Sequence, residues 1–264
     1  MATSLKAGTT WTQRILSLLV FQTLDLPKVL HWVSPWPDCR FLIGRAEMRD
    51  VVEGVTHRRF LKTHLPLDAL PCSQSTRYIY VGQDTRDVFM STWNHIRAYT
   101  PLAHALLNSG ENGPAEPFLE PLEDIREFWR LWMTRGAYPW ESDGFPYWSH
   151  HHHARTYWDF RHLPNLLLIH YNDLKADLPG EMGRIARFLD IRVPEAKWPM
   201  LADAATLARG RRGVGSRAAG SRDTWSTSAA VLAVEEAPGL QCDVIFGPLV
   251  TYARVGMTGA PHGT

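Results

Sequence analysis

A lysine, a glycine and two threonines near the start of the chain could bind an anionic group. Lys6-Ala7-Gly8-Thr9-Thr10-Trp11 lies directly before an amphipathic helical pattern. Glycine permits a tight turn, and the first amides of a helix attract anions together with the helix dipole. Lys6 adds a full charge and the threonines add hydroxyl donors, which predicts a phosphate-binding loop. Because Lys6 precedes Gly8, the loop differs from the Walker A pattern. Taken alone, it is equally compatible with an ordinary helix start.

A histidine beside a lysine forms a second candidate. Lys62-Thr63-His64 closes a short strand-like stretch, and the carboxyl edge of a parallel sheet is where ligands bind. A histidine can take a proton from a hydroxyl near neutral pH, and a neighbouring lysine can neutralise charge on a leaving group. Taken alone, His64 is more typical of a hydrogen-bonded structural histidine.

A third candidate is a strand that runs into a polar turn and then a helix. The strand covers 78–81, the turn contains Gln83, and the helix carries Ser91. This segment predicts a second phosphate site at the end of another strand. An ordinary strand, turn and helix would show the same pattern.

The elements that must position these residues alternate along the chain. Apolar spacing predicts helices over 10–24, 86–99 and 178–189, the first capped by Thr9 or Thr10. Short apolar runs predict strands over 59–64, 78–81 and 166–169. Strands that alternate with helices predict an α/β fold with a parallel sheet covered on both faces.

Composition limits the classes of partner. The 264 residues include 28 basic and 27 acidic side chains, so no global charge favours nucleic acid or an anionic membrane. The three cysteines form no CxxC pair, which argues against a disulfide scaffold and fits a reducing compartment. No apolar run approaches the roughly 18 residues of a membrane span. We therefore expect a cytoplasmic protein without a nucleic-acid partner.

The remaining segments lead to broader expectations. Residues 108–121 are rich in Gly, Pro and Glu and predict a surface loop or lid. The dense aromatic run over 128–148 indicates either the wall of an apolar pocket or ordinary core packing. Four successive histidines at 150–153 cannot all face one ion on a helix, so we expect a solvated helix end and no metal site. We expect an α/β domain over 1–209 and an atypical Gly/Ala/Arg-rich tail over 210–264, to which no fold is assigned.

Taken in order, the motifs resemble those of the cytosolic-type sulfotransferases. Residues 6–11 are similar to the family's 5′-phosphosulfate loop, and Lys62-Thr63-His64-Leu65-Pro66 to its Lys-Thr-His stretch. Residues 80–91 are similar to its 3′-phosphate segment. His170-Tyr171-Asn172-Asp173 is similar to its Tyr-Glu-Asp turn, with Asn172 in place of Glu. The resemblance runs from residue 3 to about 205 and implies a P-loop-like parallel sheet flanked by helices.

The resemblance also implies a co-substrate, 3′-phosphoadenosine 5′-phosphosulfate. The residues implied to bind it are Lys6, Ala7, Gly8, Thr9, Thr10, Trp11, Gln83, Ser91 and Tyr171. Trp11 is placed against the adenine, Ser91 at the 3′-phosphate and Tyr171 near the base.

The same resemblance implies how the group is transferred. His64 would deprotonate a hydroxyl or amine of a small-molecule acceptor, for which the aromatic run indicates an apolar or aromatic compound. Lys62 would assist at the transferring group, and Lys6 would stabilise the departing oxygen. No metal is required, since lysines neutralise the oxygens.

Three departures from the family pattern favour a second interpretation. Gln83 stands where the family has an arginine on the 3′-phosphate. The contact of that arginine with the phosphate is lost unless Arg86 compensates. Five residues precede Lys6, which implies a truncated first strand. Arg211-Arg212-Gly213 is a weak counterpart of the family's closing loop. The alternatives are therefore a truncated, catalytically inactive sulfotransferase-like domain or, less consistent with the position of Lys6, a P-loop nucleotide kinase.

Overall fold

The computed structural model describes residues 1–39, 44–71, 73–107, 122–138 and 140–206. The predicted tail over 210–264 and the predicted loop over 108–121 lie outside these residues. The proposed division of the chain at residue 209 therefore stays a prediction.

The described strands form a parallel sheet. Strand β1 (Ala2–Thr3) pairs with β2 (Tyr78–Gly82), and β2 pairs with β3 (Leu166–His170), in the order β1-β2-β3. The register places Thr3 opposite Val81, and Gly82 opposite His170. On the other side of β1, Thr63 forms a single parallel bridge with Ala2. The strand predicted over 59–64 is thus shortened to one bridge, while the two later strands are confirmed within one residue.

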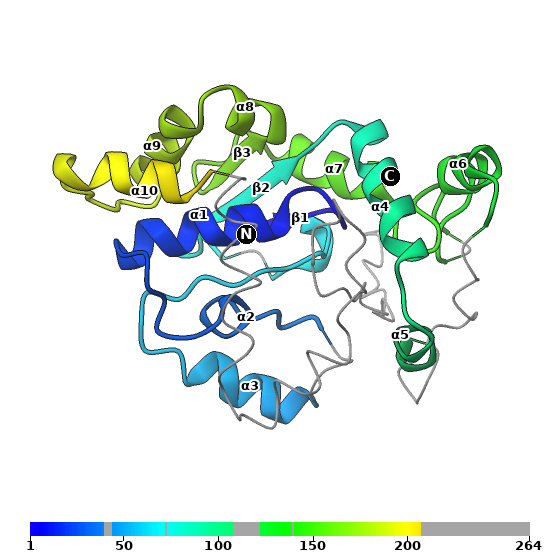
Figure 1. Ribbon diagram of the computed structural model, residues 1–264, viewed down its shortest axis with the longest axis horizontal. Helices are drawn as coiled ribbons and strands as arrows, with labels where there is room; N and C mark the ends of the chain where they lie inside the picture. Colours follow the sequence, from blue (N-terminus) through cyan, green and yellow to red (C-terminus); the bar gives the residue numbers. More distant parts are fainter. Residues whose placement is uncertain (40–43, 72, 108–121, 139, 207–264) are drawn as a thin grey trace, which may run out of the picture.

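Four helices cover one face of the sheet, as Figure 1 shows: α1 (Thr9–Phe21), α8 (Tyr171–Ala176), α9 (Leu178–Phe188) and α10 (Trp198–Ala204). Their apolar side chains pack on Ile79, Val81 and Ile169, which point to this face because strand side chains alternate. Leu18 and Ile185, from α1 and α9, are fully buried there. This packing fixes the position of α1, whose first turn forms the candidate loop.

The opposite face carries α7 (His150–Asp159) and the short 3₁₀ helix η1 (Leu67–Ala69). Tyr80 points to this side, and its ring stacks on Tyr157 with 4.5 Å between centroids. Helices therefore cover both faces of a parallel sheet, which confirms the predicted fold class.

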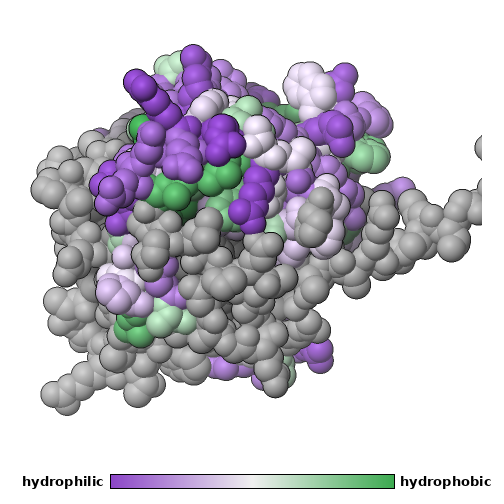
Figure 2. Space-filling model, turned by 90° about the vertical axis from the view of Figure 1, so that its right-hand side faces the viewer, coloured by the Kyte–Doolittle hydropathy of each residue, from purple (hydrophilic) through white to green (hydrophobic). Residues whose placement is uncertain are grey.

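The remaining described helices are α2 (Leu30–Val33), α3 (Arg45–Glu53), α4 (Thr85–Arg97), α5 (Pro101–Leu107) and α6 (Ile125–Thr134). Helices α4 and α6 pack through Phe89, Trp93, Phe128 and Trp132. The side on which α5 and α6 lie is shown in Figure 2, where most coloured residues are hydrophilic and the hydrophobic ones lie in a few small, separate places. Much of the aromatic run over 128–148 is thus packed in the core. This agrees with ordinary core packing, the second of the two interpretations of that run given above.

One sequence expectation about helix ends is wrong, and a second is right only in part. Residue Gly8, and neither threonine, is the N-cap of α1, because its φ of 89° turns the chain into the helix. The four histidines begin α7, but His150 and His153 are 5% and 0% exposed. They lie three residues apart, so both face inward, while His151 is exposed. In the described ranges, no three His, Cys, Asp or Glu side chains are grouped to hold a metal ion.

The helices in the described part of the chain are all too short or too polar to cross a bilayer.

Candidate active site

The sheet brings the candidate motifs to one edge. His64 follows the bridge at Thr63, the 6–11 loop follows β1, Gln83 follows β2 and Tyr171 follows β3. Since these segments are parallel and in register, their carboxyl ends meet. The site is therefore assembled by strand pairing between segments up to about 170 residues apart.

The loop before α1 is tightly turned. The amide of Ala7 donates to the carbonyl of Ser4 at 3.3 Å, and both Lys6 and Gly8 have left-handed backbone angles, with φ of 66° and 89°. A left-handed lysine is a strained residue of the kind that clusters at functional sites. The turn places the first amides of α1 at the sheet edge, where no carbonyl within the helix can accept from them. An anion can.

Tyr171 lies against this loop. A Cβ atom added to Gly8 would be 2.7 Å from Cδ2 of Tyr171, closer than carbon atoms approach. The Tyr171 ring also meets Trp11 edge-on, with 5.0 Å between centroids. Trp11 is 5% exposed, and its indole N–H donates to the carbonyl of Ala205 at 2.7 Å. The structure thus groups Tyr171 with the loop, whereas the adenine contact of Trp11 stays a prediction.

His64 is buried and held in a defined orientation. Its Nδ1 lies 2.9 Å from the carbonyl oxygen of Thr3. A carbonyl can only accept, so Nδ1 carries the proton and Nε2 is the basic nitrogen. The His64 amide donates to the Asp38 carboxylate at 3.1 Å, and the ring meets Trp36 edge-on at 5.0 Å between centroids. The geometry is that of a buried imidazole held in a fixed orientation beside an aromatic ring.

Both candidate lysines act on His64 electrostatically. Burial and then the charge of Lys62 hold the pKa of His64 well below 6.5, with a smaller contribution from Lys6, while the carbonyl of Thr3 opposes the shift. The Lys62 ammonium lies 4.4 Å from the centre of the Trp36 ring. The charges of both lysines therefore reach His64, whose ring is neutral at pH 7.

Of the two predicted 3′-phosphate residues, Gln83 lies at the sheet edge next to the loop, and Ser91 lies on the helix that follows it. Gln83 follows β2, which pairs with β1, and the half-buried Ser91 lies on α4. Arg86, the possible substitute for the family arginine, is exposed and bonded to Asp84 through Nε at 3.0 Å and Nη2 at 2.8 Å. These bonds hold the pKa of Asp84 below its usual range. In this arrangement the Arg86 side chain is bonded to the N-cap residue of α4, Asp84.

The structure adds residues that the sequence did not indicate. Asp38 and Trp36 support His64, and Ser4 contacts His150 through a hydrogen bond of 2.8 Å. Ser4 and His150 are 146 residues apart, so no local spacing could relate them.

A glycine turn leading into a helix at the carboxyl edge of a parallel sheet is typical of α/β proteins that bind nucleotide phosphates. Comparison of the chain with known protein families narrows this class. The model of the sulfotransferase domain matches residues 1–206, and the chain belongs to the sulfotransferase family.

Among curated relatives, the glycolipid sulfotransferase of Mycobacterium bovis is 38% identical over 221 residues, covering 76% of this chain and 66% of the relative. The Mycobacterium tuberculosis glycolipid sulfotransferase is 37% identical over 219 residues, with the same coverage. The chain thus spans just under two thirds of these relatives.

Solved structures confirm the fold. A retinol dehydratase in a complex with retinol and PAP is 23% identical, with a TM-score of 0.56, over 79% of this chain and 64% of that chain. The mouse sulfotransferase SULT7A1 complexed with PAP is 18% identical, with a TM-score of 0.55, over 79% and 63% of the two chains.

Proposed function

We propose that the protein transfers a sulfuryl group from 3′-phosphoadenosine 5′-phosphosulfate to a hydroxyl or amine of a small-molecule acceptor. The observation that carries this proposal is the meeting of the Lys6 loop, Lys62 and His64 at one sheet edge, with the basic Nε2 of His64 set by the Thr3 carbonyl.

Each residue has a definite part in the proposed reaction. His64 Nε2 accepts the proton of the acceptor hydroxyl as the acceptor oxygen forms a bond to sulfur. The bond from sulfur to the bridging phosphate oxygen breaks, and adenosine 3′,5′-bisphosphate leaves. Lys6 and the first amides of α1 stabilise the negative charge on that oxygen, while Lys62 neutralises the sulfuryl oxygens.

The low pKa of His64 fits this role. In the free protein the two lysines disfavour a protonated ring. The phosphosulfate would neutralise much of their charge, and the pKa of His64 would rise as the donor binds. The donor thereby makes His64 a stronger base at the time a proton has to move.

The acceptor is proposed from its surroundings and from the relatives. Tryptophans 36 and 148 lie around His64, with ring centroids 5.0 and 6.2 Å from its own. Such a setting suits an apolar or aromatic molecule with one reactive hydroxyl. The two mycobacterial relatives are named for glycolipids, so glycolipids belong in any acceptor screen. The cytoplasmic location stays a prediction.

The test follows labelled sulfate from the donor to phenols, alcohols and glycolipids. Wild type is expected to label at least one acceptor, and His64→Ala to lose more than a hundredfold in rate, as is typical for removal of a general base. The exposed His162→Ala variant is the control and should keep wild-type turnover. Turnover retained by His64→Ala would remove His64 from its role.

The inactive-domain alternative is favoured by one observation, the engagement of Arg86 with Asp84 beside Gln83. It predicts that no acceptor is labelled even at a high concentration of the donor. The kinase alternative instead predicts that ATP with magnesium raises the melting temperature and the bisphosphate does not.

A further inference from the structure

One buried hydrogen bond connects the candidate donor loop with the helix on the opposite face of the sheet. The Ser4 hydroxyl lies 2.8 Å from Nδ1 of His150, and the two residues are 2% and 5% exposed. A buried hydrogen bond between side chains so far apart in sequence fixes the relative position of two elements.

On the loop side, the bond holds the residue from which the turn begins. Ser4 follows β1, and its carbonyl accepts the amide of Ala7 at 3.3 Å, closing the turn that contains Lys6. Lys6 lies two residues after Ser4 with a φ of 66°. A left-handed lysine persists only where its surroundings impose it. The side chain of Ser4 is one such restraint.

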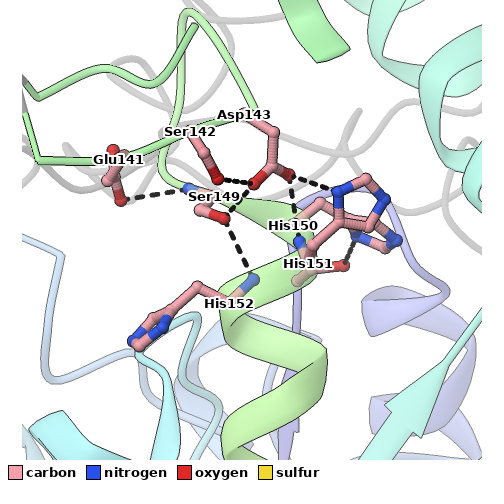
Figure 3. A network of polar contacts seen from close by, with 8 residues as sticks. Glu141, Ser142, Asp143, Ser149, His150, His151 and His152 are labelled. Carbon is pink, nitrogen blue, oxygen red and sulfur yellow. Dashed lines mark hydrogen bonds and ion pairs between the residues drawn. The ribbon is translucent and has the colours of Figure 1, made fainter. Parts of the chain in front are cut away.

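On the helix side, a network of hydrogen bonds surrounds the start of α7, as Figure 3 shows. The buried Asp143 accepts from the Ser149 hydroxyl and from the amide of His151, the latter at 3.0 Å. Glu141 accepts from the amide of Ser149 at 3.0 Å. The bond to Asp143 satisfies the amide of His151 in the first turn of α7, and the bond to Glu141 holds the N-cap Ser149, so His150 projects from a hydrogen-bonded support.

The His150 ring is neutral at neutral pH. Burial and then the neighbouring His151 lower its pKa to about 4, with Asp143 opposing. Its ring also rests on Trp132, with 5.6 Å between centroids. The bond to Ser4 therefore joins two neutral groups and does not depend on a charge.

We propose that His150 is a positioning residue for donor binding: through Ser4 it fixes the turn that presents Lys6 and the first amides of α1 to the 5′-phosphosulfate. This inference rests on the proposed function. His150 itself contacts neither the donor nor the acceptor in this proposal.

The test is a double-mutant cycle on the binding of adenosine 3′,5′-bisphosphate, measured by calorimetry. Ser4→Ala removes the hydroxyl, and His150→Phe keeps an aromatic ring on Trp132 without nitrogen. Each is expected to raise Kd about three- to tenfold, the worth of one hydrogen bond, and the double variant no further. His150→Asn places an amide near the position of Nδ1 and should stay within about twofold of wild type.

The control is His152→Phe on the same helix, whose ring faces Asp68 at 2.9 Å, away from Ser4. It should leave Kd unchanged. Additive losses in the double variant, an unchanged Kd in His150→Phe, or no rescue by Asn would overturn the proposal. A lower melting temperature with unchanged Kd would assign His150 a purely structural role.

Hydrogen exchange of the peptide over residues 4–11 separates this inference from the proposed function. Without ligand, the loop amides should exchange faster in Ser4→Ala and His150→Phe than in wild type and His152→Phe. If wild type fails to bind the bisphosphate, the proposed function is contradicted, and the positioning role in donor binding is overturned with it. Unchanged exchange would show that the bond does not restrain the loop.

Discussion

At the scale of single residues, the site depends on backbone conformations that few residues adopt. Gly8 turns the chain into α1 with a φ of 89°, and the Tyr171 ring occupies the space where a side chain would lie. The sequence predicted Lys6, Gly8 and His64 because their chemical types imply anion binding and proton transfer. The sequence predicted a threonine as the cap of α1, because hydroxyl side chains are usually preferred there. The structure has Gly8 instead, because the chain needs a left-handed turn at this position.

Replacement of Gly8 tests this account. Gly8→Ala should lower the free energy of unfolding by about 1–3 kcal/mol, from left-handed strain and the clash with Tyr171, and should abolish bisphosphate binding. The matched variant Gly183→Ala lies inside α9, where a Cβ meets Arg187 at an ordinary 3.5 Å. It should stabilise by about 0.5–1 kcal/mol. Chemical denaturation measures both, and an unchanged Gly8→Ala would contradict the assigned turn.

At the scale of elements, register decides which strand ends meet. The strands at 78–81 and 166–169 were predictable from short apolar runs between turn residues, and helix α9 from its apolar spacing. The segment before His64 was less predictable, because its single bridge to β1 comes from tertiary packing. The support that α7 gives to Ser4 was not predictable at all, since four histidines in a row show no inward-facing pattern until the helix is placed on the sheet.

The start of α7 offers a paired test at this scale. Ser149→Ala removes the N-cap bond from the amide of His152 at 3.0 Å and one of the hydrogen bonds to Asp143. The free energy of unfolding should fall by about 2 kcal/mol. The exposed Ser142 also donates to Asp143, at 3.3 Å, and Ser142→Ala should change stability by less than about 0.5 kcal/mol. A change in the free energy of unfolding of less than about 0.5 kcal/mol in Ser149→Ala as well would show that the cap does not hold the helix.

At the scale of the whole molecule, buried histidines link stability to pH. Burial lowers the pKa values of His64, His95, His150 and His153 in the folded state. The unfolded chain therefore binds more protons below pH 6.5, and stability falls as the pH decreases. Burial raises the pKa of Glu141 to about 7, which acts in the opposite sense: the folded state holds that proton more tightly between pH 4.5 and 7.

His153 gives the clearest case. Its pKa is lowered to about 3, by burial first and then by His150 and His152, with the backbone of His64 and Leu65 opposing the shift. Between pH 7 and 5, wild type should lose about 2 kcal/mol more than His153→Leu, whose apolar side chain needs no partner. Urea denaturation at both pH values measures this, with the exposed His162→Gln as control. Parallel losses in wild type and His153→Leu would contradict the assignment.

The most direct test of the account is whether the sheet edge distinguishes a nucleotide that carries a 3′-phosphate. Calorimetric titrations would compare adenosine 3′,5′-bisphosphate, adenosine 5′-monophosphate and ATP with magnesium on wild type and Lys6→Ala. The account predicts saturable one-to-one binding of the bisphosphate, at least about tenfold weaker binding of the monophosphate and of ATP, and a loss of about tenfold or more in Lys6→Ala. Equal affinity for all three nucleotides, or no binding of the bisphosphate, would contradict it.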